Sequence, residues 1–183
     1  EARFRTDFRR TLRYAEALGA KIVHIMAGVA EGPEAEATMI ENLRWAAAEA
    51  GSQRLTIEPI NRLDMPGYFL NYQGQAHDVI ETIGAANLKV QMDLYHLQIM
   101  EGDLAAGLRK WLPTGRVGHL QIAGVPMRHE PDIGEINYAS LFDVIDELSA
   151  LSGWDGWIGC EYRPARGAIE NGTSDGLAWF KHR

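Results

Sequence analysis

Four polar side chains that can bind a metal ion close four short apolar runs of the sequence. They are Glu58, Asp93, Gln121 and Glu161, and successive members are 35, 28 and 40 residues apart. Three carboxylates and an amide oxygen form a hard-oxygen ligand set, which suits Mg²⁺ or Mn²⁺ better than Zn²⁺. A cation bound there would stabilise an enolate or enediolate oxygen, and a neighbouring glutamate would move a proton between adjacent carbons. These residues therefore predict metal-assisted proton transfer.

The apolar runs are predicted to be β-strands because their side chains sort with a period of two. Each polar candidate alternates with aliphatic residues, so one strand face packs against helices and the other carries the four polar groups. The same alternation predicts that Cys160 is a core thiol. The four strands, and a fifth that precedes them, are expected at 55–59, 88–94, 117–123, 157–162 and 21–27.

Helices are predicted between the strands from apolar spacing and from capping residues. They cover 4–18, 33–50, 75–83, 103–111 and 137–148. Alternating strands and helices indicate a parallel sheet, and all four polar residues fall at the C-terminal ends of strands, where a (β/α)8 barrel places its chemistry. Such a barrel typically needs about 250 residues. We therefore predict an α/β fold, a TIM barrel truncated at its N-terminus to about five βα units, in preference to a small doubly wound sheet.

Composition narrows the class of partner. The formal net charge of -7 argues against nucleic acid, and no apolar run is long enough to span a membrane. One cysteine cannot form an internal disulfide, which fits a cytoplasmic location. The chain starts within a helical pattern at Glu1, so we expect the natural N-terminus to lie upstream. Open edges at 21–27 and 157–162 would then favour poor solubility or pairing with a second copy as a homo-oligomer.

Several segments resemble the hydroxypyruvate isomerase family, a branch of the xylose-isomerase-like TIM barrels. They are IEPIN (57–61), DMPGYFLN (64–71), DLYHLQIMEGD (93–103), HLQIA (119–123), RHEP (128–131), GEINY (134–138) and GCEYRP (159–164). The resemblance covers nearly all of residues 1–183 and implies that they form the C-terminal five-eighths of a single barrel domain. It implies metal ligands at Glu58, Asp93, Gln121 and Glu161, with the two glutamates as the acid/base pair.

The resemblance also implies the reaction. Hydroxypyruvate would be interconverted with tartronate semialdehyde through an enediolate, or a 2-oxo-tetronate would be isomerised in the same way. A hydride shift is the competing route. Other metal-dependent barrel chemistry, such as sugar epimerisation or endonuclease action, and a non-catalytic sugar-acid binding protein are the alternatives. For this small hydroxy-keto acid substrate we predict contacts from Asn61, His96, Arg128 and Arg163, with His96 bonding a substrate oxygen and an arginine binding the carboxylate.

Overall fold

The computed structural model describes residues 2–167 and 169–182, and it alternates strands with helices along the chain. The elements in order are α1 (Ala2–Leu18), β1 (Ile22–His24), α2 (Pro33–Ala50), β2 (Arg54–Ile57), α3 (Gln73–Ile83), β3 (Leu88–Asp93), α4 (Leu94–Met100), α5 (Leu104–Trp111), the 3₁₀ turn η1 (Leu112–Thr114), β4 (Val117–Ile122), α6 (Tyr138–Ser152), β5 (Ile158–Cys160), α7 (Gly172–Gly176) and the 3₁₀ turn η2 (Ala178–His182).

The strands follow the order β1-β2-β3-β4-β5 in one sheet. Strands β1 and β2, β2 and β3, and β4 and β5 pair in parallel: Val23 aligns with Leu55, Thr56 with Lys89, and Gln121 with Gly159. All five predicted strands therefore exist, although β1 and β5 are each shorter than the sequence indicated.

The chain divides into two compact units. Unit 1 contains Glu1–Met92 and Arg116–His119, and unit 2 contains Asp93–Gly115 and Leu120–Arg183. Strand β4 starts in the first and ends in the second. None of the helices in the described ranges 2–167 and 169–182 is both long and apolar enough to cross a bilayer.

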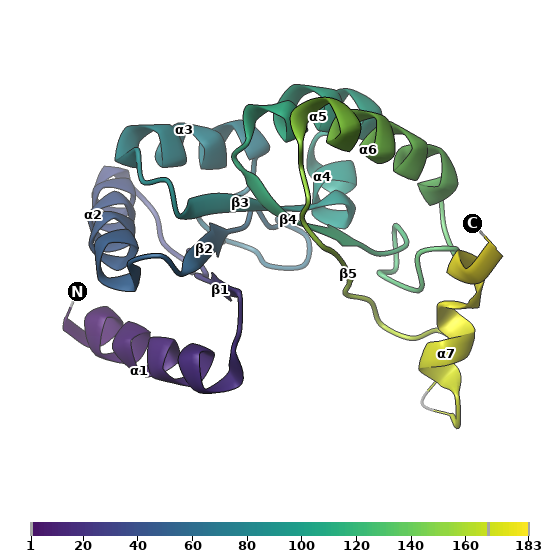
Figure 1. Cartoon of the computed structure of the whole chain (residues 1–183), viewed down its shortest axis with the longest axis horizontal. Helices are drawn as coiled ribbons and strands as arrows, with labels where there is room; N and C mark the ends of the chain where they lie inside the picture. Colours follow the sequence, from purple (N-terminus) through teal and green to yellow (C-terminus); the bar gives the residue numbers. More distant parts are fainter. Residues whose placement is uncertain (1, 168, 183) are drawn as a thin grey trace. The chain divides into compact units, whose positions relative to one another are not determined.

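In unit 1, helices α1 and α2 pack against each other and α2 also contacts α3 (Figure 1). Helix α2 starts at Pro33 and ends before its C-cap residue Gly51, as the sequence predicts. Pro33 fits a first helical turn because it has no N–H to leave unpaired, and Gly51 adopts a positive φ of 59° that other residues resist. The rings of Phe4 and Phe8 stack with centroids 5.9 Å apart, and both meet Trp45 edge-on.

In unit 2, α5 and α6 pack together through buried leucine and aromatic side chains. Asn137 caps α6 as predicted, because its side-chain oxygen accepts the backbone N–H of Ser140 at 3.2 Å. Helix α4 was not predicted. Its residues Leu94 to Leu97 are all buried, so the segment lacks the polar face that makes a surface helix recognisable in a sequence.

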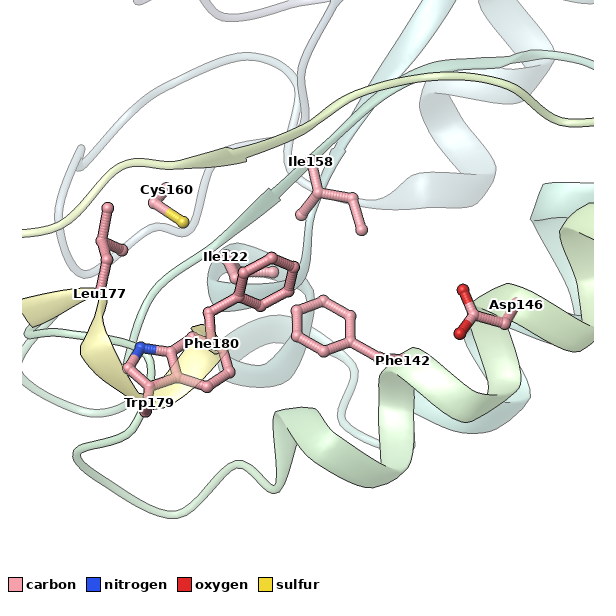
Figure 2. A pocket seen from close by; sticks show the side chains of 8 residues that line it. All are labelled: Ile122, Phe142, Asp146, Ile158, Cys160, Leu177, Trp179 and Phe180. Carbon is pink, nitrogen blue, oxygen red and sulfur yellow. The ribbon is translucent and has the colours of Figure 1, made fainter. Parts of the chain in front are cut away.

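An apolar cavity of about 490 Å³ lies in unit 2 on the helix-facing side of β4 and β5 (Figure 2). Its lining comes from both strands, α6 and the C-terminal segment: Ile122, Phe142, Asp146, Ile158, Cys160, Leu177, Trp179 and Phe180. Cys160 faces the predicted side but is exposed, so the expectation of a core thiol is wrong. Cys160 lines the cavity itself, and a residue on an open cavity wall is not enclosed as a packed core residue is.

Replacing Gly124 with alanine should destabilise the fold. A Cβ at this position would clash with the carbonyl oxygen of Ile133 and lie 2.7 Å from that of Glu130, both parts of a rigid loop backbone. Overpacking of this kind costs about 1–3 kcal/mol or more. Urea unfolding should show the loss. Gly74→Ala is the matched control, since α3 leaves open space there and alanine favours helix by up to about 1 kcal/mol. Equal stability of the two variants would contradict this packing.

Candidate active site

Two of the four predicted ligands in unit 2 meet at one guanidinium nitrogen, and a third is bonded to one of them. Arg128 Nη2 lies 3.4 Å from Asp93 Oδ2 and 3.0 Å from Glu161 Oε1. Gln121 donates its amide N–H to the second oxygen of Glu161, Oε2, at 2.9 Å. Asp93, Gln121 and Glu161 therefore share one face of the sheet, as the alternation of their strands requires.

Asp93 is the last residue of β3 and also the N-cap of α4. Its Oδ1 accepts the backbone N–H of Tyr95 at 2.8 Å, which starts the helix directly behind the strand. The side chain is fully buried. Burial raises the pKa of Asp93 to about 7, against the lowering effect of Arg128 and of the Tyr95 and His96 N–H groups, while the charge of Glu161 raises it further. Asp93 thus lies in a place that strongly favours an added positive charge.

His96 lies one helical turn after Asp93 and joins this cluster. Its Nε2 is 3.6 Å from Asp93 Oδ2, and its ring meets that of Tyr95 edge-on at 5.1 Å. The side chain is only 2% exposed. His96 is therefore placed to orient Asp93 or to serve as a further ligand, roles that the sequence did not assign to it. Its predicted hydrogen bond to a substrate oxygen stays a prediction.

Arg128 is held by the loop that follows β4. Its backbone has a φ of 57°, the left-handed region that non-glycine residues rarely occupy. The guanidinium carbon lies 5.1 Å from the centre of the Tyr95 ring, a cation–π distance, and Nε donates to the backbone oxygen of Glu161 at 3.4 Å. Arg128 and Arg163 were the two arginines predicted as partners of the substrate carboxylate. The structure adds that Arg128 also links two of the predicted ligands.

Glu58, the fourth predicted ligand, belongs to unit 1 and follows β2. Its Oε2 accepts an N–H from Gln91 at 3.0 Å and lies 3.5 Å from His24 Nε2. The side chain is 5% exposed. Nearby, burial raises the pKa of Tyr68 to about 12, and the negative charge of Glu58 contributes. That Glu58 shares one ion with the three predicted ligands of unit 2 stays a prediction.

Asn61 and Arg163, the other predicted substrate contacts, have structural roles of their own. The side-chain oxygen of Asn61 accepts the N–H groups of Leu63 and Asp64 at 3.0 and 2.8 Å, which shapes the loop after β2. Arg163 bonds through its backbone N–H to the Arg128 oxygen at 2.6 Å, and its side chain is exposed. Contact of either side chain with substrate stays a prediction.

The donor set in unit 2 fits a divalent cation. Asp93 and Glu161 direct one oxygen each at a single positively charged nitrogen, which shows that the backbone already brings both carboxylates to a common point. Carboxylate and amide oxygens are the ligands that Mg²⁺ and Mn²⁺ prefer, and His96 is compatible with Mn²⁺. Sequence reasoning overlooked His24, because that strand was expected to continue to residue 27, and Tyr95, which lies in the unpredicted helix α4. Tyr95 follows Asp93 by two residues, so a search for aromatic residues beside the ligand candidates would have found it, whereas no local signal relates His24 to Glu58.

The raised pKa of Asp93 predicts a pH-dependent stability in the metal-free protein. Its folded pKa of about 7 exceeds the ordinary 3.8, so the folded state keeps a proton that the unfolded chain releases between these values. The stabilisation of the folded state that this proton provides is fully present below about pH 4 and is lost as the pH rises through 7. Urea unfolding with a chelator should show this decline, and Asp93→Asn, which keeps an oxygen for Tyr95 N–H, should flatten it. An unchanged slope in that variant would refute the assignment.

Comparison with known proteins identifies the fold and its relatives. The family described as Xylose isomerase-like TIM barrel matches residues 1–183. The 2-oxo-tetronate isomerase of Cupriavidus necator is 51% identical over 187 residues, covering 99% of this chain and 68% of that protein. The hydroxypyruvate isomerase of Escherichia coli is 42% identical over 186 residues, covering 98% and 68%.

A solved structure supports the same fold assignment. The crystal structure of a protein named AP endonuclease, family 2, from Brucella melitensis is 43% identical in sequence, with a TM-score of 0.89 over 100% of this chain and 68% of that one. The predicted barrel is thus confirmed against the doubly wound alternative, as is the predicted relationship to isomerase enzymes. The chain belongs to the xylose isomerase-like TIM barrel family.

Proposed function

We propose that this protein is an intramolecular oxidoreductase that isomerises a small 2-keto acid with a neighbouring hydroxyl group. Hydroxypyruvate and tartronate semialdehyde are the three-carbon pair, and a 2-oxo-tetronate is the four-carbon substrate. The observation that carries the proposal is the convergence of Asp93 and Glu161 on one cationic nitrogen, with Gln121 bonded to Glu161. Relatives named for both reactions support it.

The proposed cation is Mg²⁺ or Mn²⁺, held by Asp93, Gln121 and Glu161 together with Glu58. When bound, it would polarise the substrate's carbonyl and hydroxyl oxygens and so acidify the intervening C–H. Asp93 suits a holding role, because it is fully buried and already fixed by the Tyr95 N–H. A buried carboxylate is costly to leave without a positive partner.

The proton is carried by the glutamates. Glu161 has a side chain that is 57% exposed, so substrate and water can reach it, whereas Glu58 is buried and bonded to Gln91. One of them removes the proton to give an enediolate, and a carboxyl group returns a proton to the adjacent carbon. Arg128, beside Glu161, is the proposed partner of the substrate carboxylate, because a guanidinium can bind that group through two parallel N–H bonds.

The four-carbon substrate is a second candidate with its own support, since the 2-oxo-tetronate isomerase is 51% identical to this chain over the aligned residues and the hydroxypyruvate isomerase 42%. Endonuclease action, which the name of the Brucella melitensis protein indicates for that protein, is less well supported here. Binding to nucleic acid needs a basic surface, and this chain has a formal charge of -7.

Carboxylate-to-amide substitutions should separate catalysis from ion binding. Glu161→Gln and Glu58→Gln keep a ligand oxygen and nearly the same volume, but they cannot accept the proton. Turnover should fall by roughly 10² or more, the scale of general acid–base catalysis. Asp93→Asn should act mainly by weakening the ion, so excess Mg²⁺ or Mn²⁺ should partly restore its turnover and leave the glutamate variants inactive. Near-normal turnover of both glutamate variants at saturating metal would contradict the proton-transfer roles.

Solvent isotope incorporation tests the route and the substrate together. Each keto acid is incubated in D₂O with the protein, with and without Mn²⁺, and the product is analysed by NMR. Transfer through the water-exposed carboxylate of Glu161 should introduce deuterium at carbon, because its proton exchanges with solvent. Product without deuterium would indicate a hydride shift instead. Absence of product from both substrates would refute the proposed function.

A further inference from the structure

We propose that Glu130 is a positioning residue that ties the loop after β4 to the loop after β5 and so keeps Arg128 and Glu161 together. This inference rests on the proposed function, in which these two side chains bind substrate and move its proton. Glu130 itself reaches neither the substrate nor the ion. It acts through the backbone of residues 163–166.

The carboxylate of Glu130 is fully buried and bonds the backbone of the other loop. Its Oε2 accepts the N–H of Ala165 at 3.0 Å, and its Oε1 accepts the N–H of Arg166 at 3.1 Å. The guanidinium of Arg166 adds a positive charge, with Nη1 3.9 Å from Oε1. A charged, buried acceptor with two N–H donors makes strong hydrogen bonds, and losing one partner is costly.

Further bonds continue the connection towards the site. The N–H of Arg163 donates to the Arg128 oxygen at 2.6 Å, and His129 Nδ1 lies 2.9 Å from the Arg163 oxygen. Arg128 Nε then donates to the Glu161 oxygen at 3.4 Å. Hydrogen bonds thus join the two loops all along the segment from Glu161 to Arg166. The bonds to Glu130 are the last of this series and lie farthest from the candidate ligands.

Neighbouring backbone leaves Glu130 little room to move. Its own oxygen accepts the N–H of Ile133 at 2.9 Å. On the other side lies Gly176 of α7, where an added Cβ would be 3.1 Å from Glu130 Cγ and 2.8 Å from the Tyr162 hydroxyl oxygen. Helix α7 therefore lies against the Glu130 side chain and close to the hydroxyl of Tyr162, the residue that follows Glu161. This close packing explains how one buried acid fixes both loops.

Asp132 provides a matched comparison on the same loop. It forms a two-bond ion pair with Arg166, at 3.0 and 2.8 Å, but these bonds involve only side chains. Glu130→Gln and Asp132→Asn both remove one negative charge near Arg166. Only the first removes an acceptor from a backbone N–H, because the Gln amide presents a donor to one of the two N–H groups. A role through charge alone would affect both variants equally.

The experiment measures kinetics and hydrogen exchange at a temperature where circular dichroism shows each variant folded. In Glu130→Gln, the amides of 165 and 166 should exchange faster, and the KM for the keto acid should rise about tenfold as Arg128 loses its position. Asp132→Asn should keep both values within about twofold of wild type. A purely structural role would lower the amount of active protein and leave KM unchanged.

If Glu130→Gln fails to fold, Gly176→Ala is the second probe, because its Cβ would crowd Glu130 Cγ as well as the Tyr162 hydroxyl and leaves every bonding group of Glu130 in place. It should raise KM in the same direction. Two results would overturn the positioning role. One is a folded variant in which the amides of 165 and 166 exchange faster but KM equals that of wild type. The other is wild-type protein in which these two amides are not protected from exchange. Absence of isomerase activity in wild type would instead reject the proposed function, while the exchange comparison still tests the Glu130 connection.

Discussion

A buried carboxylate needs a positive partner, and in this protein that need is concentrated at Asp93. The residue ends a strand, caps a helix and has no exposed surface, so its charge is unfavourable unless a cation stands close. In the structure Arg128 supplies part of this positive charge. The negative charge of Glu161, on the other side of Arg128, makes an ionised Asp93 less favourable. The left-handed backbone of Arg128, the Tyr95 ring beneath it and the bonds between two loops all serve to hold that one guanidinium in place.

The two proposed acid/base groups occupy different surroundings, which gives them different capacities. Glu58 lies among Gln91, His24 and the neighbouring Tyr68, where hydrogen bonding can keep its carboxylate fixed. Glu161 is largely exposed and bonded at both oxygens, to Gln121 and to Arg128. A proton on Glu161 can exchange with water, while one on Glu58 is sheltered. Pairs of carboxylates with unequal environments are the usual means by which an enzyme assigns separate acid and base roles.

The apolar side of the strands separates these polar groups from the rest of unit 2. Ile122 and Cys160 alternate with Gln121 and Glu161, so they face α6 and the aromatic C-terminal segment instead of the ligand cluster. The cavity on that side is therefore unrelated to the proposed chemistry. Period-two alternation thus gives β4 and β5 one face for packing and one for the candidate ligands.

The sequence by itself determined the strands, most helix ends and the four ligand candidates, because these depend on local rules. Alternation marks a half-polar strand, Pro33 and Gly51 bound a helix, and Asn137 caps one. Only the tertiary structure decided three other features: helix α4, the exposure of Cys160, and the hydrogen bonds that Glu130 accepts from the loop after β5. A fully buried short helix has no periodic signature, exposure depends on what covers a strand, and the Glu130 bonds join residues 35 positions apart. The position of Arg128 between two carboxylates belongs to the same class, since no local pattern relates a loop residue to the ends of distant strands.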